Sequence, residues 1–386
     1  MLISQRLDKI QAPVIPLVGE MIAANPGTIS LGQGIVHYDP PSSIVEAVSS
    51  RLSEQQSHRY GLVSGHSELI SQLKEKCEKE NGISIDESRR IIVTAGSNMA
   101  FQSTVLAIAD PGDEIIILSP YYFNHEMAIG IANCKAVVVP TDHSYQPDIA
   151  AIEAAMSTRT RAIVTISPNN PTGAVYSRDS LTAINQMCRD KGIYHICDEA
   201  YEYFVYGKSK HFSAASLPGS NEWTISLFSL SKAYGMAGWR VGYMVIPKHL
   251  EMSIKKIQDT NLICPTMLSQ FAAISALKEG RIWCDKQMQG FDAVRQLVLS
   301  ELSSLGEKIT VPKPEGAFYV FFKLANPHDD MLLVRQLIEE YKVAVMPGRT
   351  FGVGDGTYLR IAYGALSQAS VAEGMSRLIQ GLERLL

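Results

Sequence analysis

The sequence lacks the patterns that mark several large classes of protein. Its six cysteines are scattered without a Cys-x-x-Cys pair, and its nine histidines form no His-Glu-x-x-His, so we expect neither a disulfide framework nor a metal site. No run of about 18 apolar residues is present, which argues against a membrane-spanning helix and a membrane partner. The N-terminal residues 1–9 lack an apolar signal core and carry an acidic residue, which argues against targeting to an organelle. We therefore expect a reduced, cytoplasmic protein.

The chain also lacks an excess of charge of either sign. Charged residues make up 19% of the 386 residues and the formal net charge is −4, so no general attraction to nucleic acid is expected. Hydrophobic residues make up 46%, which is enough for two domains or for one large domain with an appendage.

From about residue 42 the chain alternates between helical and strand-like segments. Pro41 is followed by a predicted helix in which Ser43 and Glu46 have the spacing of a capping box. Further helices are predicted over 67–81, before Gly82, and from about Asn98. Short apolar runs predict strands at 90–94, 114–118, 135–139, 162–166, 193–197, 224–228 and 241–246. Continuous rather than alternating apolar strands, separated by helices, indicate an α/β protein with a mostly parallel sheet covered on both faces.

The last third of the chain has a different pattern. Residues 266–304 are predicted to be largely helical. A strand at 317–322, a helix at 330–341, short strands near 343–346 and 358–362, and a final helix from about 368 follow, with Leu378, Leu382 and Leu385 at helical spacing for core packing. We expect residues 42–285 to form a large domain, and residues 1–41 with 286–386 to form a smaller one.

Polar motifs follow several of the predicted strands, where doubly wound sheets bind their ligands. Gly96-Ser97-Asn98 opens a helix after strand 90–94, and the free N–H groups of a helix start suit a phosphate, although such a pair is often only a cap. Asn170 lies in a proline-rich turn after strand 162–166 and can present an amide donor. The absence of Gly-x-Gly-x-x-Gly argues against a Rossmann dinucleotide site.

Asp198 directly follows the strand at 193–197, and Tyr201 comes three residues later. A carboxylate at the edge of an apolar strand is costly unless it is paired, and a protonated pyridine nitrogen would pair it. Tyr201 could then donate to a phenolate oxygen of the same ring. The alternative for Asp198 is an ordinary helix cap.

The most informative segment is Ser229-Leu230-Ser231-Lys232-Ala233-Tyr234-Gly235-Met236-Ala237-Gly238-Trp239-Arg240. Ser229 supplies a hydroxyl and Arg240 a bidentate cation, which suit a phosphate. Lys232 between them suits an amine that forms a Schiff base, provided that its pKa is low. Taken alone, Lys232 is more simply a solvated surface lysine; the other motifs reverse that interpretation.

Together these motifs resemble the class I/II aminotransferases, the pyridoxal-phosphate enzymes of the aspartate aminotransferase fold (fold type I), over essentially the whole chain. The resemblance implies a large domain with a mostly parallel seven-stranded sheet and a smaller α/β domain. It implies that Lys232 is the Schiff-base lysine, that Asp198 faces the pyridine nitrogen and that Arg360 binds the substrate carboxylate. It further implies cofactor contacts from Ser97, Asn98, Tyr122, Asn170, Tyr201, Ser229 and Arg240, a substrate contact from Asn170, a pocket glycine at Gly34, and a tyrosine, Tyr60, that reaches the neighbouring subunit.

The resemblance implies transfer of an amino group between an L-amino acid and a 2-oxo acid, with a homodimer as the assembly. Catalytic roles fall to Lys232, Asp198 and Tyr201. A lyase of the same fold, such as a carbon–sulfur β-lyase or an aminocyclopropane carboxylate synthase, is the alternative. A non-enzymatic regulator is disfavoured, because about forty residues before the α/β body show no basic helix-turn-helix.

The sequence departs from the family pattern where the substrate side chain is usually held. Related kynurenine and methionine aminotransferases often have Pro-Asp-Phe near Gly34, whereas this chain continues Ile35-Val36-His37-Tyr38. Arg349 stands where a small residue is common and could bind a second substrate carboxylate, but a solvated rim arginine is the simpler interpretation; His37 is similarly more often a packed or surface residue. With Ile15, Leu17, Ile35, Tyr60 and Tyr122 as expected neighbours, aromatic or large neutral amino acids are the predicted substrates.

Overall fold

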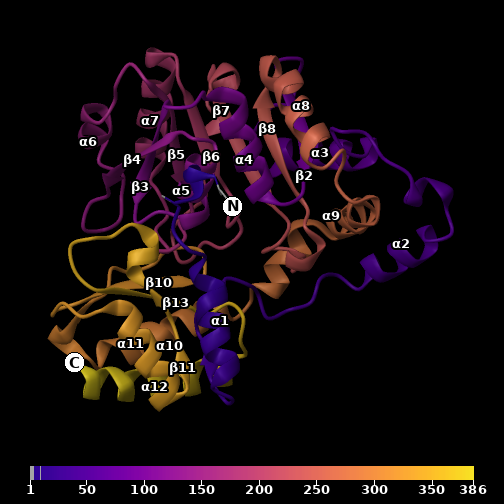
Figure 1. The fold of residues 1–386 in the computed structure, drawn as a ribbon. Coiled ribbons are helices and arrows are strands. Elements are labelled where there is room, and N and C mark those ends of the chain that lie inside the picture. Colours follow the sequence, from indigo (N-terminus) through magenta and orange to yellow (C-terminus); the bar gives the residue numbers. More distant parts are fainter. Residues whose placement is uncertain (1–3, 9) are drawn as a thin grey trace.

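The computed structural model describes residues 4–8 and 10–386, and it contains two bodies of secondary structure (Figure 1). The larger body is built on a seven-stranded sheet in the order β2-β8-β7-β6-β5-β3-β4. Its strands are β2 (Arg89–Thr94), β3 (Glu114–Ser119), β4 (Lys135–Pro140), β5 (Thr160–Ile166), β6 (Tyr194–Asp198), β7 (Thr224–Ser229) and β8 (Gly242–Pro247). Only β8 runs antiparallel to its neighbours, so the prediction of a mostly parallel sheet is confirmed.

The large sheet is buried on both faces, as its continuous apolar strands predict. Along β3, Ile115 and Ile117 belong to one hydrophobic core, whereas Ile116 and Leu118 belong to another on the opposite face. Helices cover these faces (Figure 1): α3 (Ser67–Glu80), α4 (Ser97–Ile108), α5 (Phe123–Ile131), α6 (Ile149–Ala154), α7 (Arg178–Lys191) and α8 (Glu251–Asn261). The sheet is therefore rigid, and only the loops at its edges are free to bind a ligand.

The smaller body contains an antiparallel sheet in the order β12-β13-β10-β9, with β9 (Ile309–Thr310), β10 (Tyr319–Leu324), β12 (Met346–Pro347) and β13 (Tyr358–Ala362). A separate pair joins β1 (Ile29–Ser30) in parallel to β11 (Val343–Ala344). Its helices are α1 (Val14–Ala24), α10 (Phe291–Ser303), α11 (Asp330–Tyr341) and α12 (Gln368–Leu385). In α12, Leu378 and Leu382 are buried as expected.

Two further helices connect or flank the bodies. The long helix α9 (Met267–Gln287) is interrupted at Gly280, and α2 (Ser43–Arg51) packs against it. We propose that residues 42–285 act as the large domain and that residues 1–41 and 286–386 act as the small domain. Short 3-10 helices complete the fold: Gln5–Leu7, Gln55–His58, Ala214–Ser216, Ser220–Glu222, Ala237–Trp239, Lys248–Leu250, Gly306–Lys308 and Gly348–Phe351.

Two local predictions are wrong. Ser43 is the first residue of α2 rather than its cap, and the preceding Ser42 makes no side-chain capping bond, so no capping box forms. The strand predicted from 317 begins at Tyr319, because Ala317 has a positive φ of 51°. The first forty residues contact the small body through the pairing of β1 with β11, and they also contact the large body, since Gln11 Nε2 donates to Glu126 of α5 at 3.3 Å.

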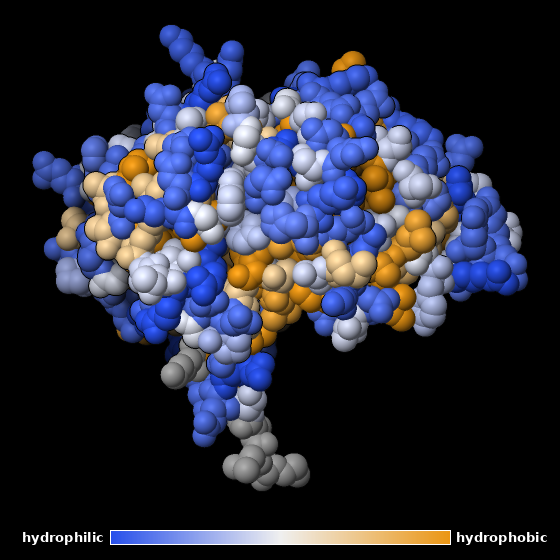
Figure 2. All heavy atoms as spheres, turned by 90° about the horizontal axis from the view of Figure 1, so that it is seen from above, coloured by the Kyte–Doolittle hydropathy of each residue, from blue (hydrophilic) through white to orange (hydrophobic). Residues whose placement is uncertain are grey.

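The surface is mostly polar but carries apolar residues in groups. Figure 2 shows apolar atoms gathered along the lower edge of that view, next to a largely polar face. Part of the exposed apolar area lies in and after α2, at Val45, Leu52, Tyr60 and Leu62. No helix among the described residues is both long enough and apolar enough to cross a membrane.

Candidate functional site

The polar motifs meet at one edge of the large sheet because the strands that precede them end at the same level. Ile166 of β5 is in register with Asp198 of β6, and Asp198 is in register with Leu227 of β7. Thr94 of β2 and Ser229 of β7 both pair with Gly242, the first residue of the antiparallel β8. Arg240 precedes β8 and therefore reaches the same edge from the opposite chain direction. The resulting pocket is lined by Ser97, Asn98, Tyr122, Ile166, Asn170, Asp198, Ala200, Tyr201, Ser229, Ser231, Lys232 and Arg240.

Lys232 lies in the turn after β7 with its amine among charged groups. Burial, the largest effect, and the nearby Arg360 and Arg240 lower the pKa of Lys232, Asp198 opposes them, and the net pKa is about 8. The amine donates to the carbonyl of Gly34 and lies 5.8 Å from the centre of the Tyr201 ring. A lysine held in this way is deprotonated much more often near neutral pH than a solvated one, which is what a nucleophile or a general base requires.

One end of the pocket is built for an anion. Gly96 has a φ of +80° and caps α4, so the first N–H groups of that helix open into the pocket. A side chain on Gly96 would meet Arg240 Nη2 at 2.5 Å, so only glycine lets the guanidinium lie against the helix start. The hydroxyls of Ser97 and Ser229 line the same pocket. A phosphate would find a dipole, hydroxyl donors and a guanidinium here.

Asp198 lies at the end of β6 and is only 5% exposed. Its Oδ2 is 3.1 Å from His125 Nε2, and its Oδ1 accepts from the Ala200 N–H at 3.1 Å. His125 stacks on Phe101 with a ring-centre distance of 3.9 Å, so its position is fixed from behind. These two contacts hold the carboxylate in one orientation. The bond to the Ala200 N–H is a local cap, as the alternative interpretation of Asp198 expected, and the carboxylate also faces the pocket.

Arg360 comes from β13 of the small body and is 2% exposed. Its Nη1 donates to Asn170 Oδ1 at 2.9 Å and its Nη2 donates to the Gly32 carbonyl at 2.6 Å. The guanidinium stacks over Tyr319 and Phe351, and its Nε has no partner among the described residues. A buried arginine held by neutral oxygens carries an uncompensated charge, which suits a carboxylate ligand.

Two tyrosines connect the two bodies at the pocket. Tyr201 and Tyr319 share a hydrogen bond of 2.7 Å between their hydroxyls, and Asn170 Nδ2 donates to Tyr201 at 3.4 Å. A side chain on Gly34 would collide with the Tyr319 hydroxyl. Tyr122 is held by Asn124, whose Nδ2 donates to its hydroxyl at 2.8 Å. The glycine at 34 therefore leaves space next to the arginine and the tyrosines.

Other predicted residues lie outside this pocket. Tyr60 is 80% exposed and does not line it. Arg349 forms ion pairs with Asp329 and Asp330, which neutralise its guanidinium. Its half-exposed side chain agrees with the simpler interpretation of a solvated arginine at the rim. His37 stacks against Phe291 but remains exposed, as a surface histidine. Ile15, Leu17 and Ile35 do not line the pocket either and remain about 40% exposed.

His125, Tyr319 and Tyr38 also contact the site groups, although the sequence motifs do not include them. His125 follows Tyr122 by three residues and so lies on the same face of the first turn of α5, a spacing that could have revealed it. Tyr319 is a tyrosine in a strand of otherwise apolar residues, and buried tyrosines usually have a polar partner. Tyr38, whose hydroxyl reaches the main chain of Lys232, gives no local signal.

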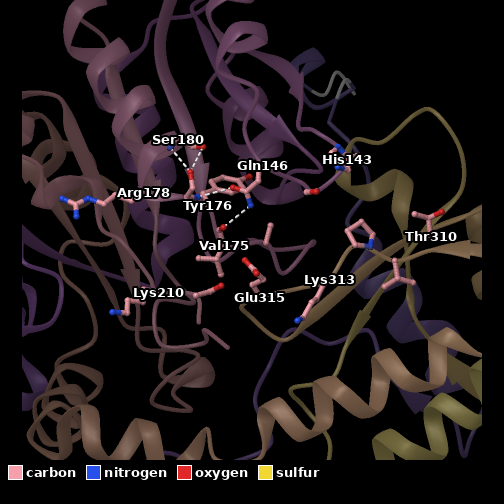
Figure 3. Close-up of a pocket in the computed structure, with 16 residues that line it drawn as sticks. His143, Gln146, Val175, Tyr176, Arg178, Ser180, Lys210, Thr310, Lys313 and Glu315 are labelled. Carbon is pink, nitrogen blue, oxygen red and sulfur yellow. Dashed lines mark hydrogen bonds between the residues drawn. The ribbon is translucent and has the colours of Figure 1, made fainter. Parts of the chain in front are cut away.

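A second cavity of about 820 Å³ lies away from these residues (Figure 3). It is formed by segments 143–146, 174–180, 209–210 and 310–315. Figure 3 shows Arg178 and Lys210 directed away from its middle, and Arg178 stacks on Phe212. None of the predicted site residues lines it, and no cluster of metal-binding side chains occurs among the described residues.

Comparison with known proteins decides the family. The model of the family "Aminotransferase class I and II" matches residues 26–378. This chain belongs to the class I and II aminotransferases. The aminotransferase is 32% identical to "Aromatic aminotransferase ISS1" of Arabidopsis thaliana, over 100% of this chain and 97% of that protein. It is 33% identical to "Aspartate aminotransferase" of Pyrococcus abyssi, over 98% of this chain and 97% of that protein.

The fold of the aminotransferase agrees with solved structures. A crystal structure of aromatic aminotransferase from Pyrococcus horikoshii OT3 matches with a TM-score of 0.86 and 32% identity, over 95% of this chain and 99% of that chain. The predicted fold type and enzyme class are thus confirmed, the comparisons do not favour the lyase alternative, and the family implies pyridoxal phosphate as the cofactor of the aminotransferase.

The charge environment of Lys232 gives a testable pH dependence. With a pKa of about 8, the amine of the cofactor-free protein should react with trinitrobenzenesulfonate about tenfold faster at pH 9 than at pH 7, with a midpoint near 8. Replacing the nearby cation in Arg360→Gln should move the midpoint to higher pH. Peptide mass spectrometry measures labelling at Lys232, with the exposed Lys208 as an internal reference. A rate that keeps rising up to pH 10 in both proteins would contradict this assignment.

Proposed function

We propose that this aminotransferase uses pyridoxal 5'-phosphate bound to Lys232 to move an amino group between an L-amino acid, aromatic or large and neutral, and a 2-oxo acid. The observation that supports it most strongly is that one pocket contains a low-pKa amine, an oriented buried carboxylate and an anion site, next to a buried arginine. Each feature is common alone. Their combination matches one cofactor and one class of substrate.

The residues of the pocket fit pyridoxal phosphate by their chemistry. Ser97, Ser229, Arg240 and the start of α4 provide donors for its phosphate. Asp198 provides a negative charge for a protonated ring nitrogen. Tyr201 and Asn170 provide donors for the ring oxygen, Tyr122 provides an aromatic face, and Asn98 lies next to the anion end. When bound, the cofactor supplies a carbonyl that condenses with amines and a ring that accepts electrons from the substrate α-carbon.

The catalytic steps assigned to the protein are binding and proton transfer. With the cofactor bound, Lys232 would hold the carbonyl carbon of the cofactor through the free amine that its low pKa makes available. Arg360 binds the α-carboxylate of the incoming amino acid. This contact orients the amino acid so that its α-hydrogen points toward the free amine of Lys232. The lysine then takes the proton from the α-carbon and returns it to the exocyclic carbon of the cofactor, acting as base and then as acid. Asp198 keeps the ring nitrogen protonated throughout.

The preference for aromatic or large neutral side chains rests on what surrounds Arg360. Tyr319 and Phe351 stack on its guanidinium, and Tyr122 lines the pocket. Arg349, the one candidate cation that the sequence offered for a second substrate carboxylate, is neutralised by two aspartates. Similar proteins carry the names aromatic aminotransferase and aspartate aminotransferase, so substrate tests must separate these two groups.

Replacing Lys232 tests the proposed chemistry. The Lys232→Ala protein should fold, should lose the visible absorbance of the protein-bound cofactor, and should lose transaminase activity by at least about 10³-fold, because no other amine lines the pocket. Absorbance spectra and a coupled 2-oxo acid assay measure both. Lys208→Ala, which removes an exposed lysine outside the pocket, should behave as wild type. Normal turnover in Lys232→Ala would refute the proposal.

A panel of amino donors tests the substrate class. Phenylalanine, tyrosine, tryptophan, methionine and kynurenine should give higher kcat/KM values than aspartate and glutamate with 2-oxoglutarate, pyruvate or glyoxylate as acceptor. A half-reaction without acceptor should convert the bound cofactor to pyridoxamine phosphate, whereas a lyase would release pyruvate or a cyclic product and regenerate the aldehyde. Activity confined to aspartate and glutamate would overturn the substrate assignment.

We also propose that the protein acts as a homodimer in which Tyr60 completes the site of the partner. Tyr60 does not line the pocket of its own chain, and it lies with Leu52 and Leu62 on an exposed apolar segment after α2, which projects from the body (Figure 1). Exposed apolar area of this kind is typical of an interface. A cytoplasmic location is proposed as well, because all six cysteines are free thiols, as in reducing compartments.

Mixing two inactive proteins tests the shared site. In a heterodimer of Tyr60→Ala and Lys232→Ala subunits, one site would combine the intact lysine of one chain with the intact tyrosine of the other. Refolding an equal mixture should therefore restore about a quarter of wild-type activity, since half of the dimers carry one complete site. If Tyr60 served its own chain, no site would be complete and the activity of the mixture would equal the average of the two parents.

A further inference from the structure

The chain between Gly32 and Pro40, here called the strap, lies across the catalytic groups. The Gly32 carbonyl accepts from Arg360 Nη2 at 2.6 Å. The Gly34 carbonyl accepts from the Lys232 amine. The strap therefore contacts both the arginine of the small body and the lysine of the large one through its main chain.

Further along the strap, Tyr38 contacts the main chain of the same lysine. Its hydroxyl donates to the Lys232 carbonyl at 2.9 Å and lies 3.1 Å from the Ala233 carbonyl. The Lys232 carbonyl also accepts from the Gly235 N–H at 3.1 Å, which closes the turn. Gly235 has a φ of +65°, and a side chain there would lie 2.9 Å from the Tyr38 carbonyl. The turn is thus shaped to let the strap approach it closely.

The Tyr38 ring is held independently of its hydroxyl. It packs edge-on against Trp283 of α9 and Phe291 of α10, with ring centres 5.8 Å and 6.3 Å apart, and against His37 at 5.6 Å. Because these contacts fix the ring, the hydroxyl makes its bonds without further loss of conformational freedom. Removing the Tyr38 hydroxyl oxygen alone should leave the ring packed against the same neighbours.

This placement matters because the Lys232 side chain is long and flexible. Its lowered pKa depends on its position among Arg360, Arg240 and Asp198, and a shifted main chain would move the amine relative to all three. A tyrosine that only satisfied its own hydroxyl would need one acceptor, whereas the Tyr38 hydroxyl lies within hydrogen-bond distance of two successive carbonyls, those of Lys232 and Ala233, in a turn that the Gly235 N–H already closes. We propose that Tyr38 is a positioning residue for Lys232, which it serves by fixing the turn that carries the lysine. The inference rests on the proposed function of Lys232.

Tyr38→Phe tests the inference, with Tyr234→Phe as the matched control. Tyr234 belongs to the same aromatic cluster, stacks on Trp283, and its hydroxyl has no hydrogen-bond partner among the described residues. In Tyr38→Phe, hydrogen exchange of a peptide covering 230–236 should accelerate, and the pH midpoint for trinitrobenzenesulfonate labelling of Lys232 should move upward. The kcat should fall about fivefold, the effect of one net hydrogen bond, with little change in KM. Tyr234→Phe should match wild type in all three measurements.

Phe291→Leu provides a second variant should Tyr38→Phe fail to fold. This variant keeps the Tyr38 hydroxyl but weakens the packing around the Tyr38 ring. The hydrogen-exchange rate of peptide 230–236 and the pH midpoint of Lys232 labelling should therefore shift in the same direction by a smaller amount. Wild-type exchange, midpoint and kcat in Tyr38→Phe would overturn the inference, and so would a loss of thermal stability alone. The labelling reagent needs no cofactor. A shifted midpoint in a protein that never bonds pyridoxal phosphate would refute the proposed function while supporting the positioning role.

Discussion

The buried carboxylate of Asp198 is the constraint on which the rest of the site depends. A carboxylate at the closed edge of an apolar sheet is strongly destabilising unless a partner compensates it. His125 and the Ala200 N–H occupy one side of it, and its remaining surface faces the pocket. The carboxylate therefore favours a ligand that brings a positive charge to that point, and under the proposed function a pyridinium would do so.

The other charges of the site are arranged around this one. Arg360 and Arg240 both lower the pKa of Lys232, whereas Asp198 opposes them. The three cations come from separate places in the chain, namely the turn after β7, the position two residues before β8, and β13 of the small body. The antiparallel β8 matters for this reason, because it delivers Arg240 to the edge where the parallel strands end. Under the proposed function, substrate binding at Arg360 would couple the small body to the chemistry of the large one.

Much of this could be predicted from the sequence because it is encoded locally. Each apolar run gave a strand, and Ser97, Asn170, Asp198, Ser229 and Lys232 each lie within a few residues of a strand end, so a parallel sheet necessarily brings them together. The helix over 330–341 was predicted with correct limits, since its apolar period is regular and Asp329 caps it. The α2 start was misplaced, because two consecutive serines offer equivalent caps and tertiary packing decides between them.

The residues that the sequence did not reveal act through contacts between distant segments. Tyr319 and Gly34 meet because the small sheet docks against the strap, and Tyr38 reaches Lys232 across 194 residues of chain. No periodicity encodes such a contact. Ile15, Leu17 and Ile35 do not line the pocket, and apolar character alone does not say which surface a side chain meets.

The central claim is that Asp198 holds a proton on the ring nitrogen of the cofactor. The most direct measurement is the nitrogen-15 chemical shift of pyridoxal phosphate labelled in its ring and bound to the protein, recorded at pH 8 for wild type and for Asp198→Asn. The account predicts a pyridinium shift in wild type and a neutral-pyridine shift in the variant, which should still bind the cofactor through Lys232 and its phosphate. A neutral-pyridine shift in wild type would contradict the account.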